Sequence, residues 1–273
     1  MKVSLIQMNS GSDKPANLEQ ARSLIERAVA EEKPDWIGLP EVWDFIGGSK
    51  RDKLAAAEEL PGGPAWSLMS ELAAKHRVFI HAGSILEKAG EDKMHNTTLV
   101  FDRDGKEIAR YRKIHMFDIT APDGTSYRES ASFTAGDAVV TYDCEGVTFG
   151  CSICYDVRFP YLFQALADKG AQVIALPAAF TLQTGKDHWE VLCRARAIET
   201  GCFVLAAAQC GTHPAPHSPD ARPRRSHGHS LAVAPWGEVM ADAGTEPGVT
   251  LVDIDLSQVA DARARIPAWR HDP

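Results

Sequence analysis

Two cysteines three residues apart, Cys151 and Cys154 in "VTFGCSICYDVRFP", have a spacing that suggests chemistry. Such a pair can be a redox dithiol, half of a metal site, or a nucleophile beside an unrelated structural cysteine. Cys151 falls inside a β-rich run, where successive side chains point to opposite faces, so the two thiols are expected to diverge. This geometry disfavours a dithiol, because a disulfide needs its two Cβ atoms close together.

A metal site would need two further ligands. Candidates are His213, His217, His227 and His229, which lie in or beside the segment 210–228. Their spacing matches no common structural zinc pattern, and histidines in a polar loop can simply be solvated. The segment itself is rich in Pro, Ser, His and Arg and has neither helical nor strand periodicity, which is typical of a long loop that is mobile or shapes a site.

The third interpretation places Cys154 on a sharp turn between a strand and a helix, the position from which a nucleophile is exposed at a sheet edge. A cysteine nucleophile needs a base, and the oxyanion that it generates needs a donor or a cation. Glu41 in "GLPEVWDF" and Lys113 in "YRKIHMFD" each close an apolar or β-rich run and could supply both. A surface Glu or Lys can also end a strand without any catalytic role.

The elements that must position these residues alternate between β and α. We expect strands at 2–8, 35–41, 77–86, 171–179, 202–208, 229–243 and 248–256, strand pairs within 96–113 and 136–154, and helices at 16–32, 64–76, 161–170 and 187–200. Asn17 and Gln20 are spaced like a capping box, and Gly170 and Gly201 stand where helices end. With no linker or composition break, the pattern predicts one α/β domain over 1–273, with helices outside the sheets.

Composition narrows the function. The 273 residues are 44% hydrophobic and carry a formal net charge of −8, so no basic excess is present to bind nucleic acid or an anionic membrane. No apolar run is long enough for a membrane span, and the start "MKVSLIQMNS" does not look like a signal peptide. Six cysteines in mostly apolar segments indicate buried free thiols. We therefore expect a cytoplasmic protein that acts on a small molecule.

The three motifs "GLPEVWDF", "YRKIHMFD" and "CYDVRFP" resemble, in order and spacing, the signatures of the carbon-nitrogen hydrolase (nitrilase) superfamily. The resemblance implies that Glu41, Lys113 and Cys154 are catalytic and that Glu129 in "SYRES" is the family's second glutamate. The segments from 171 to 211 and from 228 to 239 are similar to the branch that holds deaminated glutathione amidase and ω-amidase, and "PEVWDFIG" leans toward the former. The resemblance also implies a four-layer αββα sandwich and a homodimer or higher homo-oligomer.

The groups suggest a mechanism. Glu41 would take the thiol proton while Cys154 attacks an amide carbon, and the oxyanion would lie against the Lys113 ammonium and the backbone N–H of Tyr155. Glu129 would orient Lys113 or the substrate nitrogen, although pairing with Arg128 or Arg112 is an alternative. Water then hydrolyses the thioester, and no metal or organic cofactor is needed.

The resemblance implies an amide substrate with a carboxylate, and therefore a cation in the pocket. Arg158 is the first candidate, and Arg194 and Arg196 on the expected helix 187–200 come next. Alternatively, Arg158 or Arg196 makes a buried ion pair with Asp156 or Glu199.

Trp43 and Phe180 are candidate pocket walls, although aromatic residues there can equally be core. The expected activity is that of a deaminated glutathione amidase. The alternatives are ω-amidase action on 2-oxoglutaramate, hydrolysis of an N-carbamoyl amide or a nitrile, and, from another class, a catalytically silent scaffold.

Overall fold

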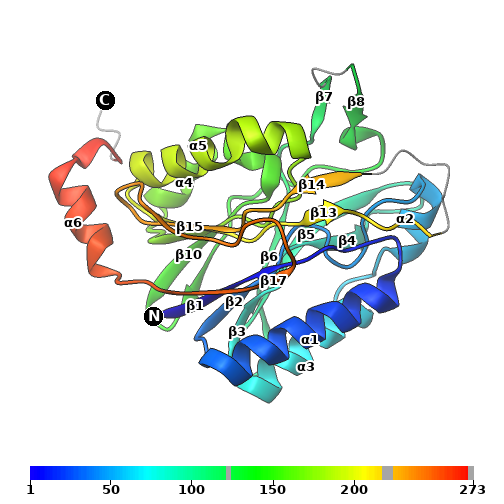
Figure 1. The fold of residues 1–273 in the computed structure, drawn as a ribbon, viewed down its shortest axis with the longest axis horizontal. Coiled ribbons are helices and arrows are strands. Elements are labelled where there is room, and N and C mark those ends of the chain that lie inside the picture. The colour runs from blue at the N-terminus through cyan, green and yellow to red at the C-terminus, as the bar shows by residue number, and fades with distance from the viewer. Residues whose placement is uncertain (121–123, 217–223, 270–273) are drawn as a thin grey trace.

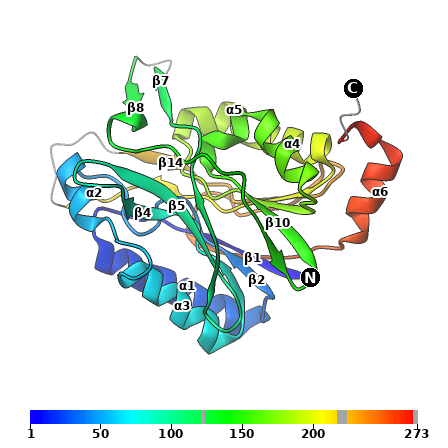
Figure 2. The same cartoon turned by 180° about the vertical axis from the view of Figure 1, so that it is seen from behind.

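The computed structural model describes residues 1–120, 124–216 and 224–269, and it has four layers. Two β-sheets face each other, and each carries helices on its outer face, so that α1 and α3 lie on one side of the molecule and α4 and α5 on the other (Figures 1 and 2). The expected αββα sandwich is therefore confirmed. None of the helices in the described ranges is long and apolar enough to cross a membrane.

The first sheet lies under α1 (Lys14–Glu32) and α3 (Pro64–His76). Its strand order is β17 (Gly248–Asp253), β1 (Lys2–Gln7), β2 (Trp36–Gly38), β3 (Phe79–His81), β5 (Met94–Phe101) and β4 (Ile85–Lys88), with β6 (Glu107–Arg112) also paired to β5. Strands β1, β2 and β3 are parallel, and the remaining pairings are antiparallel.

The second sheet lies under α4 (Pro160–Asp168) and α5 (Leu182–Thr200). Its order is β16 (Val239–Asp242), β15 (Leu231–Val233), β12 (Phe203–Ala206), β11 (Val173–Ala175), β10 (Val147–Cys151) and β9 (Thr141–Cys144). Here β10, β11 and β12 form the parallel centre. Each parallel centre is buried on both faces, which explains why these strands read as continuous apolar runs.

Shorter elements surround the edge where the two sheets meet. These are α2 (Lys50–Ala56), the ribbons β7 (Asp118–Thr120) with β8 (Ser126–Arg128) and β13 (Cys210–Thr212) with β14 (Arg225–His227), and the 3₁₀ helices η1 (Glu129–Ala131) and η2 (Cys154–Arg158). Helix α6 (Ser257–Arg265) and η3 (Pro267–Trp269) end the described chain at the opposite side (Figure 1).

The largest core cluster lies between the sheets and continues beneath α4 and α5. Trp36 of the first sheet stacks on Phe149 of the second with ring centroids 5.5 Å apart, and its indole N–H donates to the Tyr142 hydroxyl. Burial of aromatic rings of this size, each worth several kcal/mol on truncation to alanine, fixes how one sheet sits on the other. That fit decides how residues at the ends of different strands meet.

Two elements begin elsewhere than the sequence predicts. Helix α1 starts at Lys14 and is capped by Asp13, whose carboxylate accepts from the Ala16 N–H at 3.1 Å. The predicted cap at Asn17 is wrong, because that side chain is buried and its amide instead donates to the Gly11 and Asp44 carbonyls. Helix α5 starts at Leu182, five positions before the expected 187, since its polar first turn shows no apolar period.

The strand expected at 77–86 is two strands, β3 and β4, separated by a turn at Gly83. Gly83 has φ +51°, and a Cβ there would lie only 2.0 Å from the Pro40 carbonyl oxygen. Glycine therefore lets this turn approach the Leu39–Pro40 backbone closely. The next residue along from Pro40 is Glu41, so the turn helps to set where that carboxylate lies.

Candidate active site

Cys154 sits on a strained turn directly after β10. Its φ is +47°, a left-handed value that costs a residue with a side chain free energy, and its N–H donates to the Pro177 carbonyl at 2.9 Å. Cys154 is the first residue of η2, and α4 begins only at Pro160. The sequence therefore predicted the strand-to-turn placement of the cysteine, but the helix follows after a 3₁₀ turn.

Glu41 follows β2 at the corresponding end of the other sheet. Ser84 brackets its turn: the Ser84 hydroxyl accepts from the Val42 N–H at 2.9 Å, and the Ser84 N–H donates to the Pro40 carbonyl at 3.1 Å. Val42 itself has φ +44°, which is unusual for a β-branched residue. Because both sheets present the carboxyl ends of parallel strands to the same edge, Glu41 and Cys154 meet there.

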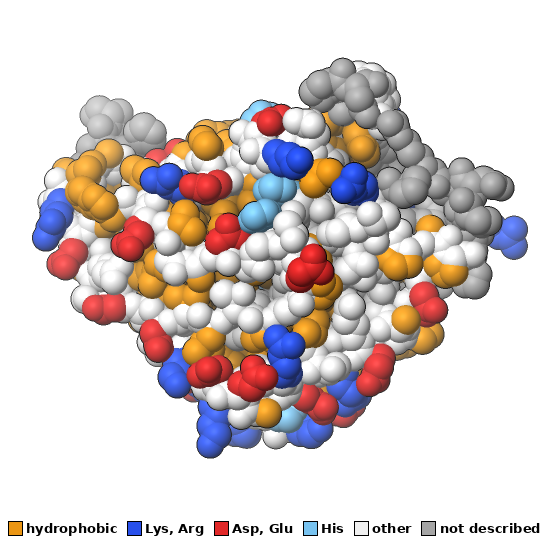
Figure 3. Space-filling model, in the orientation of Figure 1, with side chains coloured by type: hydrophobic (Ala, Val, Ile, Leu, Met, Phe, Trp, Pro, Cys, Tyr) orange, Lys and Arg blue, Asp and Glu red, His pale blue; other side chains and the backbone are white. Residues whose placement is uncertain are grey.

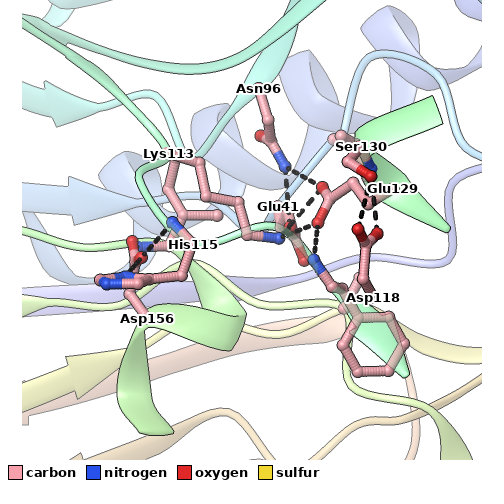
Figure 4. Close-up of polar contacts among 12 residues, drawn as sticks. Glu41, Asn96, Lys113, His115, Asp118, Glu129, Ser130 and Asp156 are labelled. Atoms are coloured by element: carbon pink, nitrogen blue, oxygen red, sulfur yellow. Dashed lines mark hydrogen bonds and ion pairs between the residues drawn. The ribbon is translucent and has the colours of Figure 1, made fainter. Parts of the chain in front are cut away.

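Lys113 follows β6 and is held between two carboxylates (Figure 4). Its ammonium donates to Glu41 at 2.9 Å and to both oxygens of Glu129 at 2.9 and 3.1 Å. Asn96 donates to Glu41 at 2.8 Å, and the Phe117 N–H donates to Glu129 at 2.6 Å. The expected alternatives for Glu129, ion pairs with Arg128 or Arg112, are not formed in the described structure; Arg112 pairs with Glu87.

Asp156 joins the Lys113 segment to the cysteine turn. Fully buried, it accepts from the Tyr111 hydroxyl at 2.6 Å and the Ile153 N–H at 2.8 Å, and one of its oxygens contacts the His115 ring nitrogen at 2.6 Å. Tyr111 and His115 flank Lys113 in sequence. This one carboxylate therefore fixes the spacing between the ammonium and the thiol.

The thiol, the carboxylate and the ammonium are electrostatically linked. The Cys154 thiol hydrogen-bonds to Glu41, and the Ala179 N–H donates to its sulfur. Burial and the Glu41 charge raise the pKa of Cys154 well above its usual value, although Lys113 opposes this. Burial pulls the pKa of Glu41 upward, but Lys113 and the Cys154 hydrogen bond outweigh it and bring that pKa below its usual value. The resting site is therefore a protonated thiol beside a carboxylate.

Lys113 stays charged in this setting. Burial disfavours its ammonium, but the charges of Glu129 and Glu41 more than compensate and raise the pKa of Lys113. A buried ammonium that forms hydrogen bonds to two carboxylates is preorganised, since its position does not depend on solvent.

Glu41, Lys113, Glu129 and Cys154 line a pocket of about 190 Å³. Its walls include Phe180 and Tyr155, as well as Phe45, Phe117 and Tyr127. Phe180 thus lines the pocket. Trp43 does not: it is fully buried in the core beneath α1 and α3, and its indole donates to the Ala82 carbonyl.

The structure does not bring the predicted arginines into the pocket lining. Arg158 lies behind the wall, over the rings of Tyr155 and Phe180 at 5.8 and 5.4 Å, with its guanidinium against His188. Arg196 is buried, donates to the Val157 carbonyl at 2.7 Å and forms an ion pair with Glu199. This ion pair is the alternative to substrate binding that the sequence left open for Arg196. Both side chains face away because the apolar faces of η2 and α5 pack against the sheet.

Arg194, the remaining arginine candidate, lies on the outer side of α5. Its guanidinium donates to the Gly237 carbonyl at 2.8 Å and pairs with Glu190. It therefore anchors the turn between β15 and β16 rather than the pocket.

Several polar pocket residues were not predicted from the sequence, among them Asn96, Lys53 and Arg224. Asn96 lies on β5, and Lys53 lies on α2, a helix that the sequence analysis did not expect. Arg224 comes from the segment 210–228, whose ends form the ribbon of β13 and β14. The irregular composition of that segment was the only signal in the sequence, because its paired strands are too short to show alternation.

Neither alternative for the Cys-x-x-Cys pair is supported by the described residues. All six cysteines are free, and Cys151 is buried in β10, away from the pocket lining. No group of three or more His, Cys, Asp or Glu in the described ranges could hold a metal ion. His213 is hydrogen-bonded to Ser10 and Ser226, and His229 to Asp242; His217 lies outside the described residues.

Comparisons with known proteins agree with this geometry. The family model described as carbon-nitrogen hydrolase matches residues 2–264. The deaminated glutathione amidase of Synechocystis sp. is 40% identical over 97% of this chain and 96% of its own length. The human omega-amidase NIT2 is 39% identical over 98% and 94%. The solved Saccharomyces cerevisiae Nit3, described as a nitrilase superfamily member, has a TM-score of 0.85 and 31% identity over 98% and 94%.

Proposed function

The chain belongs to the carbon-nitrogen hydrolase family, and we propose that it opens a small carboxylate-bearing amide through a thioester on Cys154. Like its amidase relatives, it is a hydrolase of carbon-nitrogen bonds other than peptide bonds. The observation that carries the proposal is that Glu41, Lys113 and Cys154 are linked to one another and line the same pocket. A silent scaffold would have no reason to keep a buried ammonium between two carboxylates beside a thiol.

Because the resting thiol is protonated, its proton moves to Glu41 as the sulfur attacks the amide carbon. The developing oxyanion is stabilised by the Lys113 ammonium and by the Tyr155 N–H, each worth on the order of 3 kcal/mol. Glu41 then returns the proton to the leaving nitrogen, and the carbon-nitrogen bond breaks to leave the thioester. Water, losing its proton to Glu41, adds to the thioester, and the thiol departs with that proton.

Glu129 supports this cycle as a positioning residue. It holds Lys113 with both oxygens, and the Phe117 N–H fixes it in turn. Glu129 also leaves Lys113 positively charged when Glu41 is transiently protonated. Of the two roles predicted for Glu129, orienting the lysine is the one that these contacts favour.

The substrate that we propose is deaminated glutathione, since the amidase of that name is 40% identical to this chain over nearly its whole length. The near-equal 39% identity to an omega-amidase supports 2-oxoglutaramate as a second candidate. No observation singles out an N-carbamoyl amide or a nitrile.

Release of amine or ammonia from a panel of these four compounds tests the proposal. We expect hydrolysis of deaminated glutathione by the wild type and by Cys151→Ala, a matched buried cysteine outside the pocket, but not by Cys154→Ala. Turnover that survives in Cys154→Ala would contradict the mechanism. Preferred hydrolysis of 2-oxoglutaramate would keep the mechanism and select the second substrate.

We further propose that the protein is a homodimer through α4 and α5. Tyr161, Val191, Ile198 and Trp236 expose 63, 68, 52 and 57% of their surface on or beside these helices. Val191 and Ile198 are seven positions apart and so share a helix face, and the turn bearing Trp236 contacts Ile198. Ile198→Glu should reduce the sedimentation coefficient to that of a monomer, whereas Ile266→Glu, an exposed apolar control, should not.

The remaining features of the proposal concern the chain as a whole. The family model spans residues 2–264, and β17 near the end pairs with β1 at the start, which supports one domain over 1–273. Six buried free thiols suit the reducing cytoplasm. Acidic and basic side chains are interspersed over the face in Figure 3, which favours a small-molecule partner over nucleic acid or a membrane surface.

A further inference from the structure

The pocket carries more positive charge than the proposed chemistry uses. Among the described residues, its lining has four cationic side chains, Lys53, Lys113, Arg128 and Arg224, and two carboxylates, Glu41 and Glu129. Both carboxylates are committed to Lys113. Arg128 is exposed on β8, so Lys53 and Arg224 are the cations that remain inside without an ion-pair partner in the described chain.

Arg224 is the less satisfied of the two. Its Nε atom is buried and has no hydrogen-bond partner, and its guanidinium makes one long bond, 3.4 Å, to the Ala179 carbonyl. Burying a charged donor atom without a partner costs free energy, whereas Arg196, which is buried, and Lys14, which is half-buried, both have carboxylate partners. Among the described residues, Arg224 is therefore left able to pair with an anion that enters the pocket.

The position of Arg224 is fixed by its backbone. Its carbonyl accepts from the His213 N–H at 2.9 Å, and the His213 ring bridges the Ser226 hydroxyl and the Ser10 carbonyl, each at 2.7 Å. The next strand, β14, runs beside the 180–181 segment, since the His227 N–H donates to the Phe180 carbonyl. These bonds hold the backbone from which the Arg224 side chain extends.

This position is close to the nucleophile. Ala179 donates its N–H to the Cys154 sulfur and accepts from Arg224 through its carbonyl. Only the backbone of Ala179 therefore separates the Arg224 guanidinium from the Cys154 sulfur. A carboxylate that binds Arg224 would lie a short carbon chain away from an amide carbon at Cys154.

We propose that Arg224, assisted by Lys53, binds a carboxylate of the amide substrate and so selects anionic over neutral amides. The inference rests on the proposed amidase function, but it assigns the recognition to a residue other than Arg158, which Tyr155 and Phe180 cover. A planar guanidinium with free N–H groups can hold a carboxylate with two parallel hydrogen bonds. Lys53 contributes a point charge from α2 and lines the same pocket.

Protection of Cys154 from alkylation tests this without turnover. Glutarate, a dicarboxylate with the shape of a short acid product, should slow iodoacetamide labelling of Cys154 in the wild type and in Arg225→Gln, the exposed neighbouring control. In Arg224→Gln the glutarate concentration for half protection should rise about 10- to 100-fold, as expected for loss of a charge-assisted pair. Arg224→Lys, which keeps the charge but not the fork, should be intermediate. Equal protection in wild type and Arg224→Gln would overturn the proposal.

Kinetics separate this inference from the proposed function. The ratio of kcat/KM for glutaramate to that for the neutral pentanamide should fall about 10- to 100-fold in Arg224→Gln and stay constant in Arg225→Gln. An unchanged ratio in an active Arg224→Gln enzyme would refute carboxylate recognition and leave the amidase intact. Arg224-dependent glutarate protection in a protein that hydrolyses no amide would refute the amidase and support the anion site.

Discussion

Replacing Glu41 by glutamine is expected to abolish hydrolysis and, at the same time, to make Cys154 easier to alkylate. In the free enzyme the Glu41 charge and its hydrogen bond hold the proton on the sulfur, because both raise the pKa of Cys154. Glutamine removes that charge and leaves Lys113 and the Ala179 N–H to stabilise a thiolate. The group that serves as base during turnover therefore suppresses the thiolate at rest.

The size of the effect follows from the charges. Two unit charges about 4 Å apart interact by roughly 4 kcal/mol at an effective dielectric constant near 20, and about 1.4 kcal/mol corresponds to one pKa unit. Glutamine removes most of this interaction, so we expect the pKa of Cys154 to fall in Glu41→Gln and the thiolate fraction to rise. A less basic thiolate is a weaker nucleophile, which offsets part of that gain, so the alkylation rate should rise by about 10-fold.

The assay is the rate of iodoacetamide incorporation at Cys154, followed by mass spectrometry at neutral pH. Glu129→Gln is the matched control, because Glu129 contacts Lys113 as closely as Glu41 does but forms no hydrogen bond with the thiol. It should change the rate less. Slower labelling of Glu41→Gln than of the wild type would refute the reasoning, since it would mean that the carboxylate already draws the proton away at rest.

Two further predictions concern buried carboxyl groups. Burial raises the pKa of Asp44 to about 7 despite its contact with Lys14, so its contribution to stability is present at low pH and is lost as the pH rises through that value. In the wild type, the unfolding free energy should fall between about pH 4 and 7 by at most about 1.4 kcal/mol per pH unit, and Asp44→Asn should reduce this fall. Unfolding free energies from urea titrations at several pH values measure it, and the same pH dependence in the variant as in the wild type would contradict the prediction. Asp156→Asn replaces one accepting oxygen by a donor facing Tyr111 or His115, and we expect a loss of roughly 3 kcal/mol of stability and at least about a 10-fold loss in kcat/KM. Full activity of the folded variant would show that Asp156 does not position Lys113.

How far the sequence could predict the site depends on whether a residue's role is local. Glu41, Lys113 and Cys154 each follow a strand, and the rule that strand ends gather at a sheet edge brings them together. Family resemblance added Glu129, which lies in η1 and has no strand of its own to mark it. The layers and most strands were predicted for the same reason, because apolar runs and turn residues are local signals.

Proximity in sequence to a catalytic residue was misleading. Trp43 is two positions after Glu41, but the positive φ of Val42 turns it into the core. Arg158 is four positions after Cys154, yet it lies behind the aromatic wall. Side-chain direction at such turns depends on tertiary packing, which a single sequence does not reveal. Arg224 reaches the pocket for the same reason, through pairing of β14 with β13 and Thr181.

The pocket holds two groups of charges in different electrostatic states, and this separates chemistry from recognition. In the first group, Lys113 and its two carboxylates form a closed hydrogen-bonded set that carries an excess negative charge at rest. In the second, Arg224 and Lys53 have no ion-pair partner in the described chain, and the Arg224 charge lowers the pKa of Lys53 beyond the effect of burial, although Glu129 opposes this. An anionic substrate relieves that repulsion when it binds, whereas a neutral amide does not. Because the free energy gained beside these cations requires the carboxylate to reach Arg224, it also holds the amide carbon beside Cys154.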